Sequence, residues 1–208
     1  MRRRIGIAKN YKDSLISLEG LQMSNKEEEE LYADIQDLEE HLTAINLSNN
    51  CFIDIASTSP IATLRGLTVL NLDCNGLTHV PSALYSTLPL LTRLSLAGNH
   101  IRHFVPSSTH SSVAVGSVDC CCSDTLTHLD LSRNRFHEFP DLSQFSNLLA
   151  LKVSGNMLSV LPSDLGTNEA LLPSLSSLSV DDNALSSLPP HFERRVAHLR
   201  ELRLSGNA

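Results

Sequence analysis

Residues 126–140 read LTHLDLSRNRFHEFP, and this stretch decides the fold. Its apolar residues and its asparagine follow the pattern L-x-x-L-x-L-x-x-N-x-L, and a Phe-Pro pair closes it. The same pattern returns at residues 42–52, 67–77, 91–101, 148–158 and 175–185, and an unfinished copy occupies residues 199–207. A pattern that returns this often at a near-constant spacing predicts a repeat architecture.

The middle of each copy has the period of a β-strand. Leu129, Asp130 and Leu131 alternate apolar and polar side chains, as a strand with one buried face requires. Each copy therefore predicts one short strand, and stacked copies predict a parallel sheet. No copy can bury its leucines alone, so contacts between neighbouring coils must supply the stability.

One asparagine stands at the same position of every copy. The chain must turn sharply after the strand, which leaves buried backbone N–H and C=O groups without sheet partners. An unsatisfied buried group costs about 1–3 kcal/mol, and an asparagine amide offers both donors and an acceptor. The sequence therefore predicts a structural asparagine ladder that bonds the turns of adjacent coils: Asn50, Asn75, Asn99, Asn134, Asn156, Asn183 and Asn207.

These copies resemble the leucine-rich repeat family, and the resemblance covers residues 42–208. It implies an α/β fold, a leucine-rich-repeat solenoid with a curved parallel sheet on the concave face and short helices and turns on the convex face. Residues 81–88 illustrate a convex segment, with Pro81 expected at the first position of a helical turn. The apolar-Pro pair that closes several copies resembles intracellular members of the family.

The first segment, residues 1–23, is expected to hold a degenerate repeat. Leu18, Leu21 and Met23 are spaced like the leucines of the copy that begins 24 residues later. This spacing predicts an extra opening strand, although Lys26 stands where the asparagine is expected.

The second segment, residues 24–41, predicts an acidic amphipathic helix that caps the solenoid. Ser24 and Glu27 form a capping-box pattern, and Leu31 and Ile35 belong to an apolar stripe at helical spacing. The net charge of the chain is −7, and it is concentrated in this segment. The repeats are nearly neutral and lack the basic face of a nucleic-acid binder, so no nucleic-acid partner is expected.

An insertion interrupts the repeats. Successive asparagines are 22 to 27 residues apart, but Asn99 and Asn134 are 35 apart. The additional residues predict a surface loop at about residues 107–124. Insertions in repeat proteins lie on one edge and often add a binding function.

The cysteines favour a reducing compartment. There are five, at positions 51, 74 and 120–122, and an odd number is not typical of a disulfide framework. The resemblance associates secreted members with paired-cysteine caps, which neither end has. No window suits a membrane span, and the basic start MRRR lacks an apolar stretch behind it. The expected location is the cytoplasm, with the nucleus and the cilium left open.

No motif indicates catalysis. The chain has no G-x-S-x-G, P-loop or dinucleotide fingerprint, and its nine histidines form no H-E-x-x-H pair. A metal site at residues 120–122 would have only His110 and Asp119 nearby as further ligands, so free thiols in a loop are expected. The sequence predicts no enzyme, no cofactor and no metal site.

The side chains beside the buried leucines are expected to point to the concave face. Their charges are mixed, and the aromatic anchors of tight interfaces are missing. This predicts an intracellular protein-interaction module or scaffold of modest affinity. An alternative is a regulatory or recruiting segment of a larger enzyme, or of a phosphatase, GTPase or ciliary complex. The candidate partner-binding residues are Arg93, His128, Asp130, Arg133, Lys152, Asp181, Asp182 and Arg203.

The last copy stops before its final apolar position. Leu199, Leu202 and Leu204 are therefore expected to be more exposed than their counterparts in the central copy. Apolar coil ends and free strand edges invite pairing, so self-association through an open C-terminal end is expected.

Overall fold

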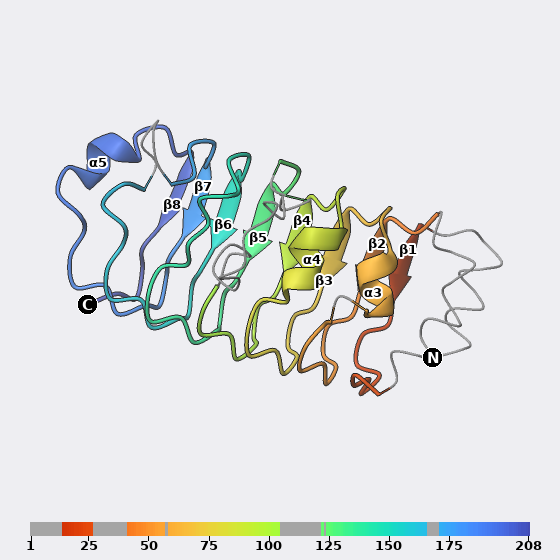
Figure 1. The fold of residues 1–208 in the computed structure, drawn as a ribbon. Coiled ribbons are helices and arrows are strands. Elements are labelled where there is room, and N and C mark those ends of the chain that lie inside the picture. The colour runs from red at the N-terminus through yellow and green to blue at the C-terminus, as the bar shows by residue number, and fades with distance from the viewer. Residues whose placement is uncertain (1–13, 27–40, 57, 105–121, 123, 166–170) are drawn as a thin grey trace, which may run out of the picture.

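The chain winds into a solenoid that carries one eight-stranded sheet along its length (Figure 1). The computed structural model describes residues 14–26, 41–56, 58–104, 122, 124–165 and 171–208. Each coil contributes one strand of three residues. The strands are β1 (Leu15–Ser17), β2 (Ala44–Asn46), β3 (Val69–Asn71), β4 (Arg93–Ser95), β5 (His128–Asp130), β6 (Ala150–Lys152), β7 (Ser177–Ser179) and β8 (Glu201–Arg203).

Neighbouring strands are parallel and follow sequence order, so every coil contacts the coils before and after it. The central leucines align from strand to strand: Leu94 pairs with Leu129, and Leu129 pairs with Leu151. Because successive side chains of a strand point to opposite faces, the aligned leucines point to the core and the residues beside them to the open sheet face. The predicted fold class, an α/β solenoid on a parallel sheet, is confirmed.

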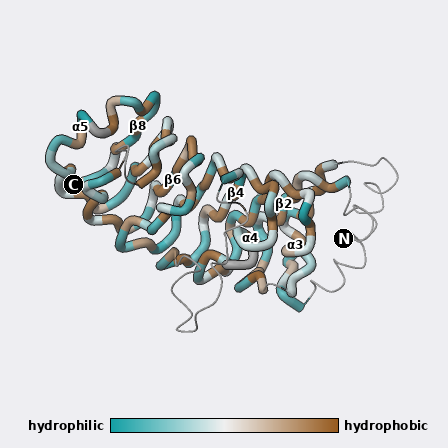
Figure 2. Tube along the Cα trace, turned by 45° about the horizontal axis from the view of Figure 1, so that its top comes forward, coloured by the Kyte–Doolittle hydropathy of each residue, from teal (hydrophilic) through white to brown (hydrophobic). Residues whose placement is uncertain are grey.

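A single hydrophobic core runs through the solenoid from Ile16 to Val196. Leu129 is 2% exposed and Leu131 is fully buried. Hydrophobic residues return at similar places in successive coils (Figure 2). Burying one leucine side chain contributes about 1.5–3 kcal/mol, and each coil reaches that burial only with a neighbour against it.

Within the described residues, three short helices lie between strands: α3 (Pro60–Thr63), α4 (Ser82–Thr87) and α5 (Phe192–Arg195). The Ser59 hydroxyl caps α3 by accepting a hydrogen bond from the N–H of Ile61 at 3.3 Å. The first residue of α3 is a proline, at the position where a missing N–H costs least.

The sequence predicts Pro81 as the first helical residue of this segment, but the helix begins one residue later. Pro81 is instead the N-cap residue of α4 and has an extended backbone. Its carbonyl oxygen accepts the N–H of Leu84 at 3.1 Å, so the first turn closes on the proline from outside the helix.

The opening repeat exists, but its predicted register is wrong. β1 pairs Ile16 with Ile45, residues that are 29 positions apart rather than 24. The amide oxygen of Asn50 accepts the N–H groups of Leu21 at 3.1 Å and Met23 at 2.9 Å. Leu21 therefore occupies the asparagine position, and Met23 the last apolar position. The gaps of three and two residues before Met23 fit both registers, so the leucine spacing alone does not decide between them.

Two predictions lie outside the described residues. The acidic helix at 24–41 falls almost entirely on residues 27–40, and the inserted loop at about 107–124 falls on 105–121 and 123. The sheet itself continues past the insertion, because β4 and β5 pair directly.

Aromatic rings pack in the core between the coils of β4 and β5. Tyr85 of α4 stacks on Phe104 with ring centroids 5.7 Å apart, and Phe104 meets Phe145 edge to face at 5.8 Å. Cys122 is buried and donates its N–H to the Tyr85 carbonyl oxygen at 3.3 Å. Such aromatic pairs add about 0.5–1.5 kcal/mol to their burial.

The last coil is less covered than the central ones. Leu202 of β8 is 37% exposed, against 2% for Leu129 at the same position of β5, and Leu199 and Leu204 are only partly buried. The prediction of greater exposure for these three leucines is confirmed.

Candidate functional site

The asparagines fix the turn that follows each strand. Asn134 is 7% exposed, and its amide nitrogen donates to the carbonyl oxygens of Leu131 and Ser132 at 3.0 and 3.1 Å. The same nitrogen donates to Leu96 of the preceding coil at 2.9 Å, and the amide oxygen accepts the N–H of Ile101 there at 3.1 Å. Asn50, Asn75, Asn99, Asn156, Asn183 and Asn207 bond their own and the preceding coil in the same pattern.

The residue before each asparagine has a left-handed backbone. Its φ lies between 53° and 69° in every one of these coils, at Asn49, Cys74, Gly98, Arg133, Gly155, Asp182 and Gly206. A non-glycine residue pays about 1–2 kcal/mol for this conformation. Sequence reasoning missed this feature, although three glycines directly before an asparagine were a signal for it.

A second ladder holds the starts of the strands, and sequence reasoning missed it too. The hydroxyl of Thr68 donates to the carbonyl oxygen of Thr43, that of Thr92 to Thr68, and that of Thr127 to Thr92, each at 3.0 Å. Leu149 breaks the series and is 41% exposed. These bonds hold the starts of neighbouring strands against one another, and so position the side chains that follow on the sheet face.

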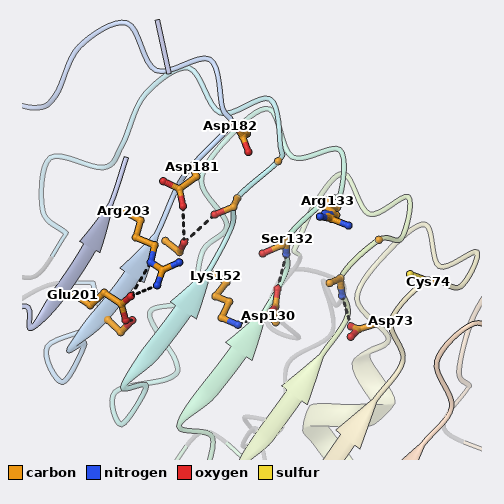
Figure 3. A pocket seen from close by; sticks show the side chains of 16 residues that line it. Asp73, Cys74, Asp130, Ser132, Arg133, Lys152, Asp181, Asp182, Glu201 and Arg203 are labelled. Atoms are coloured by element: carbon orange, nitrogen blue, oxygen red, sulfur yellow. Dashed lines mark hydrogen bonds and ion pairs between the residues drawn. The ribbon is translucent and has the colours of Figure 1, made fainter. Parts of the chain in front are cut away.

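A groove of about 570 Å³ crosses the sheet face at the strand ends, and Figure 3 shows its labelled side chains. We name it the large groove. Its lining begins at Asp73, after β3, and reaches Arg203 of β8, so six coils contribute to it. The sheet face is therefore hollowed over these six coils.

Most carboxylates of the large groove accept hydrogen bonds from neighbouring groups. Asp73 accepts the Ser95 hydroxyl at 2.6 Å and the N–H of Ala97 at 2.7 Å. Asp181 accepts the N–H of Ser205 at 2.7 Å and the Ser179 hydroxyl at 3.2 Å. These bonds leave the carboxylates rigid on a solvent-facing surface.

Two ion pairs lie in the same groove. Arg203 contacts Glu201 at 2.7 Å, and Lys152 lies 3.4 Å from Asp130. Hydrogen bonds from Arg203 and then Ser177 lower the pKa of Glu201 below its ordinary value. The Arg203–Glu201 pair is exposed, and in the other pair Lys152 is exposed while Asp130 is partly buried. Pairs this close to solvent contribute about 0–1 kcal/mol to stability.

Two charged side chains of the groove remain open. Among the described residues, Arg133 and Asp182 make no side-chain hydrogen bond or ion pair. Both carry the left-handed backbone of the turn, which places them at the rim (Figure 3).

A second groove of about 270 Å³ adjoins the first over β3 to β6. We name it the small groove. Arg93, His128 and Lys152 line it together with the apolar side chains of Val69 and Ala150. Burial, and then the positive charges of Arg93 and Lys152, lower the pKa of His128 below the ordinary value of 6.5.

The two grooves contain every residue proposed from the sequence for partner binding. Arg93 and His128 line the small groove, Asp130 and Lys152 line both, and the large groove holds the remaining four: Arg133, Asp181, Asp182 and Arg203. Sequence reasoning did not name Cys74, Gly98 or Gly155, which occupy the same turn position as Arg133 and Asp182 but carry no charge.

The described residues contain no group of three or more His, Cys, Asp or Glu side chains arranged to hold a metal ion. In the same part of the chain, no helix has the length and apolar character needed to cross a bilayer.

Comparison with protein families agrees with this geometry. Residues 65–115 and 125–148 each match a family model described as a leucine-rich repeat. The chain belongs to the leucine-rich repeat family. Domains of this family generally act as protein–protein interaction modules.

Curated relatives share the repeats over most of this chain. It is 32% identical over 184 residues to mouse Tsukushi, covering 80% of this chain and 51% of Tsukushi. It is 32% identical over 170 residues to an adenylate cyclase of Schizosaccharomyces pombe, covering 80% of this chain and 9% of that protein. The leucine-rich repeat chain therefore spans about half the length of Tsukushi and far less of the cyclase.

Solved structures share the solenoid. A leucine-rich repeat protein of Leptospira interrogans superposes with a TM-score of 0.64 at 25% identity, over 84% of this chain and 39% of that one. The leucine-rich repeat domain of APL1B superposes with a TM-score of 0.69 at 20% identity, over 97% of this chain and 57% of that one. The second likeness establishes the fold alone.

Proposed function

We propose that this chain is a protein-interaction module, or scaffold, that binds a segment of a partner protein along its concave face. The observation that carries the proposal is the large groove, because six consecutive coils line one continuous hollow and five of them contribute charged side chains to it. Adjacent strands lie about 4.8 Å apart, and an extended chain rises about 3.3 Å per residue. A groove across six strands therefore suits a segment of roughly seven residues.

The chemistry of the face indicates how it would bind. Acidic and basic side chains are mixed along it, and Arg133 and Asp182 are open to pair with a partner. Charged rims of this kind favour fast association and specificity over raw affinity. Large aromatic anchors, which dominate tight interfaces, are missing from the described residues that line the two grooves. We expect modest affinity that falls as salt rises.

The test is partner capture with variants that fill the grooves. Ala97→Trp places a large side chain in the large groove, and Ala150→Trp does so in the small groove. Ser159→Trp adds the same bulk at an exposed position outside both grooves and is the matched control. Capture followed by mass spectrometry should lose the same proteins with both groove variants and retain them with the control. A protein profile unchanged by both groove variants would remove the concave face as the binding surface.

A second candidate is a regulatory or recruiting repeat segment of a larger protein. The match that covers 80% of this chain but only 9% of an adenylate cyclase favours it. Sequencing of the full-length transcript tests this candidate. A coding sequence that adds a catalytic domain supports it, and one that adds none rejects it.

We further propose a cytoplasmic location. Cys51 and Cys74 are exposed free thiols, and Cys122 is a buried one, which supports a reducing compartment. Labelling with a membrane-impermeant maleimide tests this location. Modification of Cys51 and Cys74 only after cell lysis is expected, and modification in intact cells would contradict it.

A further inference from the structure

Three basic side chains from three adjacent strands surround the small groove. Arg93 belongs to β4, His128 to β5 and Lys152 to β6, and Arg93 and His128 are direct register partners. Register partners on neighbouring strands lie about 5 Å apart at the backbone. The floor between them is partly apolar, with Val69 and Ala150 in the lining.

Asp130, the only carboxylate among the described residues of this lining, is already engaged. One oxygen of Asp130 lies 3.4 Å from the Lys152 ammonium, and the other accepts the N–H of Ser132 at 3.0 Å. Among the described residues, the Arg93 guanidinium has no hydrogen bond or ion pair. The charge of Lys152 is thus compensated within the fold, whereas that of Arg93 is not.

Thr127 positions the imidazole ring of His128. Its hydroxyl oxygen lies 2.9 Å from Nδ1 of His128 and 3.0 Å from the Thr92 carbonyl oxygen. That carbonyl oxygen also accepts the backbone N–H groups of Thr127 and His128, at 2.9 and 3.0 Å. In a protonated imidazole both ring nitrogens are donors, so protonation makes His128 a charged donor.

We propose that a carboxylate side chain of an acidic partner segment docks between Arg93 and His128 in the small groove, and that His128 takes up a proton when it binds. This inference rests on the proposed function and names the partner chemistry for one part of the same face. The partner carboxylate supplies the negative charge that Arg93 lacks, and a protonated imidazole supplies a second charge-assisted donor.

The groups that face His128 determine its response to pH. Arg93 on β4 and Lys152 on β6 oppose its protonation, as does burial, and together they lower its pKa. Asp130 on β5 is shared between Lys152 and a backbone N–H. An incoming carboxylate offsets the two cations, so binding and protonation reinforce each other.

A carboxylate fits this groove better than a phosphate. The Asp130 carboxylate lines the same hollow, and it repels a dianion about twice as strongly as a monoanion. The partner group is therefore assigned as an aspartate or glutamate side chain.

The probe is a seven-residue peptide of alternating serine and glutamate, acetylated and amidated at its ends, titrated into the isotope-labelled 208-residue chain and followed by NMR. A peptide with glutamine in place of glutamate is its control. We expect the backbone signals of β4, β5 and β6 to shift with the acidic peptide only. Affinity should rise roughly three- to tenfold between about pH 7.5 and pH 5.5, as one histidine is charged.

Matched variants separate this site from general charge effects. Arg93→Gln should weaken the peptide roughly two- to fivefold, whereas Arg135→Gln, which removes the same charge from an exposed position outside both grooves, should not. His128→Gln should remove most of the gain at low pH, and His137→Gln, exposed in the same coil, should preserve it. Circular dichroism of each variant confirms that it is folded.

Three results would overturn the inference. They are equal binding of the acidic and glutamine peptides, an unchanged pH dependence in His128→Gln, and binding of inorganic phosphate at Arg93 without binding of the acidic peptide. If Ala97→Trp still abolishes capture of the natural partner in any of these cases, the proposed function stands and only the acidic chemistry fails. If neither groove variant affects capture, the proposed function fails as well.

Discussion

The sulfur of Cys74 lies over the backbone of Gly98, the residue at the equivalent position of the next coil. A Cβ atom on Gly98 would stand 3.0 Å from that sulfur and 3.5 Å from the Cys74 nitrogen. Both residues have left-handed backbones, with φ of 53° and 68°. Glycine at this position therefore serves two purposes, because it adopts the conformation without strain and leaves room for its neighbour.

Replacing Gly98 with alanine should destabilise the chain more than replacing Gly20. Gly20 has the same φ of 68°, but a Cβ there meets nothing within 4 Å. We expect Gly20→Ala to cost about 1–2 kcal/mol from backbone strain alone, and Gly98→Ala to cost more because contact is added. Urea denaturation measures both values.

A double variant isolates the contact. Cys74→Gly should recover part of the loss in Gly98→Ala, since it removes the sulfur that the new methyl group meets. Equal costs for Gly20→Ala and Gly98→Ala would mean that only the backbone angle matters.

Asn134→Ala should cost about 1–3 kcal/mol, because it leaves the N–H of Ile101 without its partner and removes one of the two amide donors to the Leu96 carbonyl oxygen, the other being Asn99. Asn147→Ala is the control, since Asn147 is exposed and makes one bond, to the Asp124 carbonyl oxygen. Thermal denaturation compares the two variants. Similar losses would show that the ladder bonds contribute no more than a surface amide.

Leu129→Ala should cost about 2–5 kcal/mol by opening a cavity in the core. Leu202→Ala at the same template position should cost far less, because that side chain is 37% exposed and has a sheet neighbour on one side only. Denaturant titration measures both, and equal losses would mean that the last coil is as well packed as the centre. Self-association through this coil stays a prediction, which sedimentation of the 208-residue chain tests.

His128 should make the free chain less stable as the pH falls. Its folded-state pKa is lowered from 6.5, so the unfolded chain takes up this proton at a higher pH than the folded chain does. Stability is then lost as the pH falls from about 6.5 towards the folded value, and the loss is complete below it. His128→Gln should reduce that loss, and His137→Gln should not. Chemical denaturation at several pH values measures the effect.

The sequence predicted the features that every coil repeats. Leu129 and Asn134 occupy positions whose physical demands are the same in each copy, so comparison of the copies reveals them without a structure. All eight residues proposed for partner binding line the two grooves. Alternation along a strand explains the five that lie in strands, which are Arg93, His128, Asp130, Lys152 and Arg203. The other three, Arg133, Asp181 and Asp182, lie in the turn that follows a strand.

Features that depend on angles or on the neighbouring coil were not predictable in this way. The register of β1 was wrong because Leu18, Leu21 and Met23 satisfy the template twice. The left-handed residue before the asparagine is a glycine in some coils and Cys74, Arg133 or Asp182 in others, so residue type hides it. The threonine ladder was missed because threonine beside a buried leucine looks like any other solvent-facing residue.

Each asparagine reaches back by one coil and no further. The asparagine of one coil can therefore bond any neighbouring coil that offers the same backbone groups. Asn99 and Asn134 illustrate this, because they are 35 residues apart and still bond the preceding coil in the same way. Gain or loss of one whole coil would leave the remaining bonds unchanged and alter the face by about 4.8 Å, roughly one and a half residues of an extended ligand. The length of the sheet face can therefore change by whole coils while the bonds between the remaining coils stay the same. A protein of this design can match a longer or shorter partner segment without rebuilding its core.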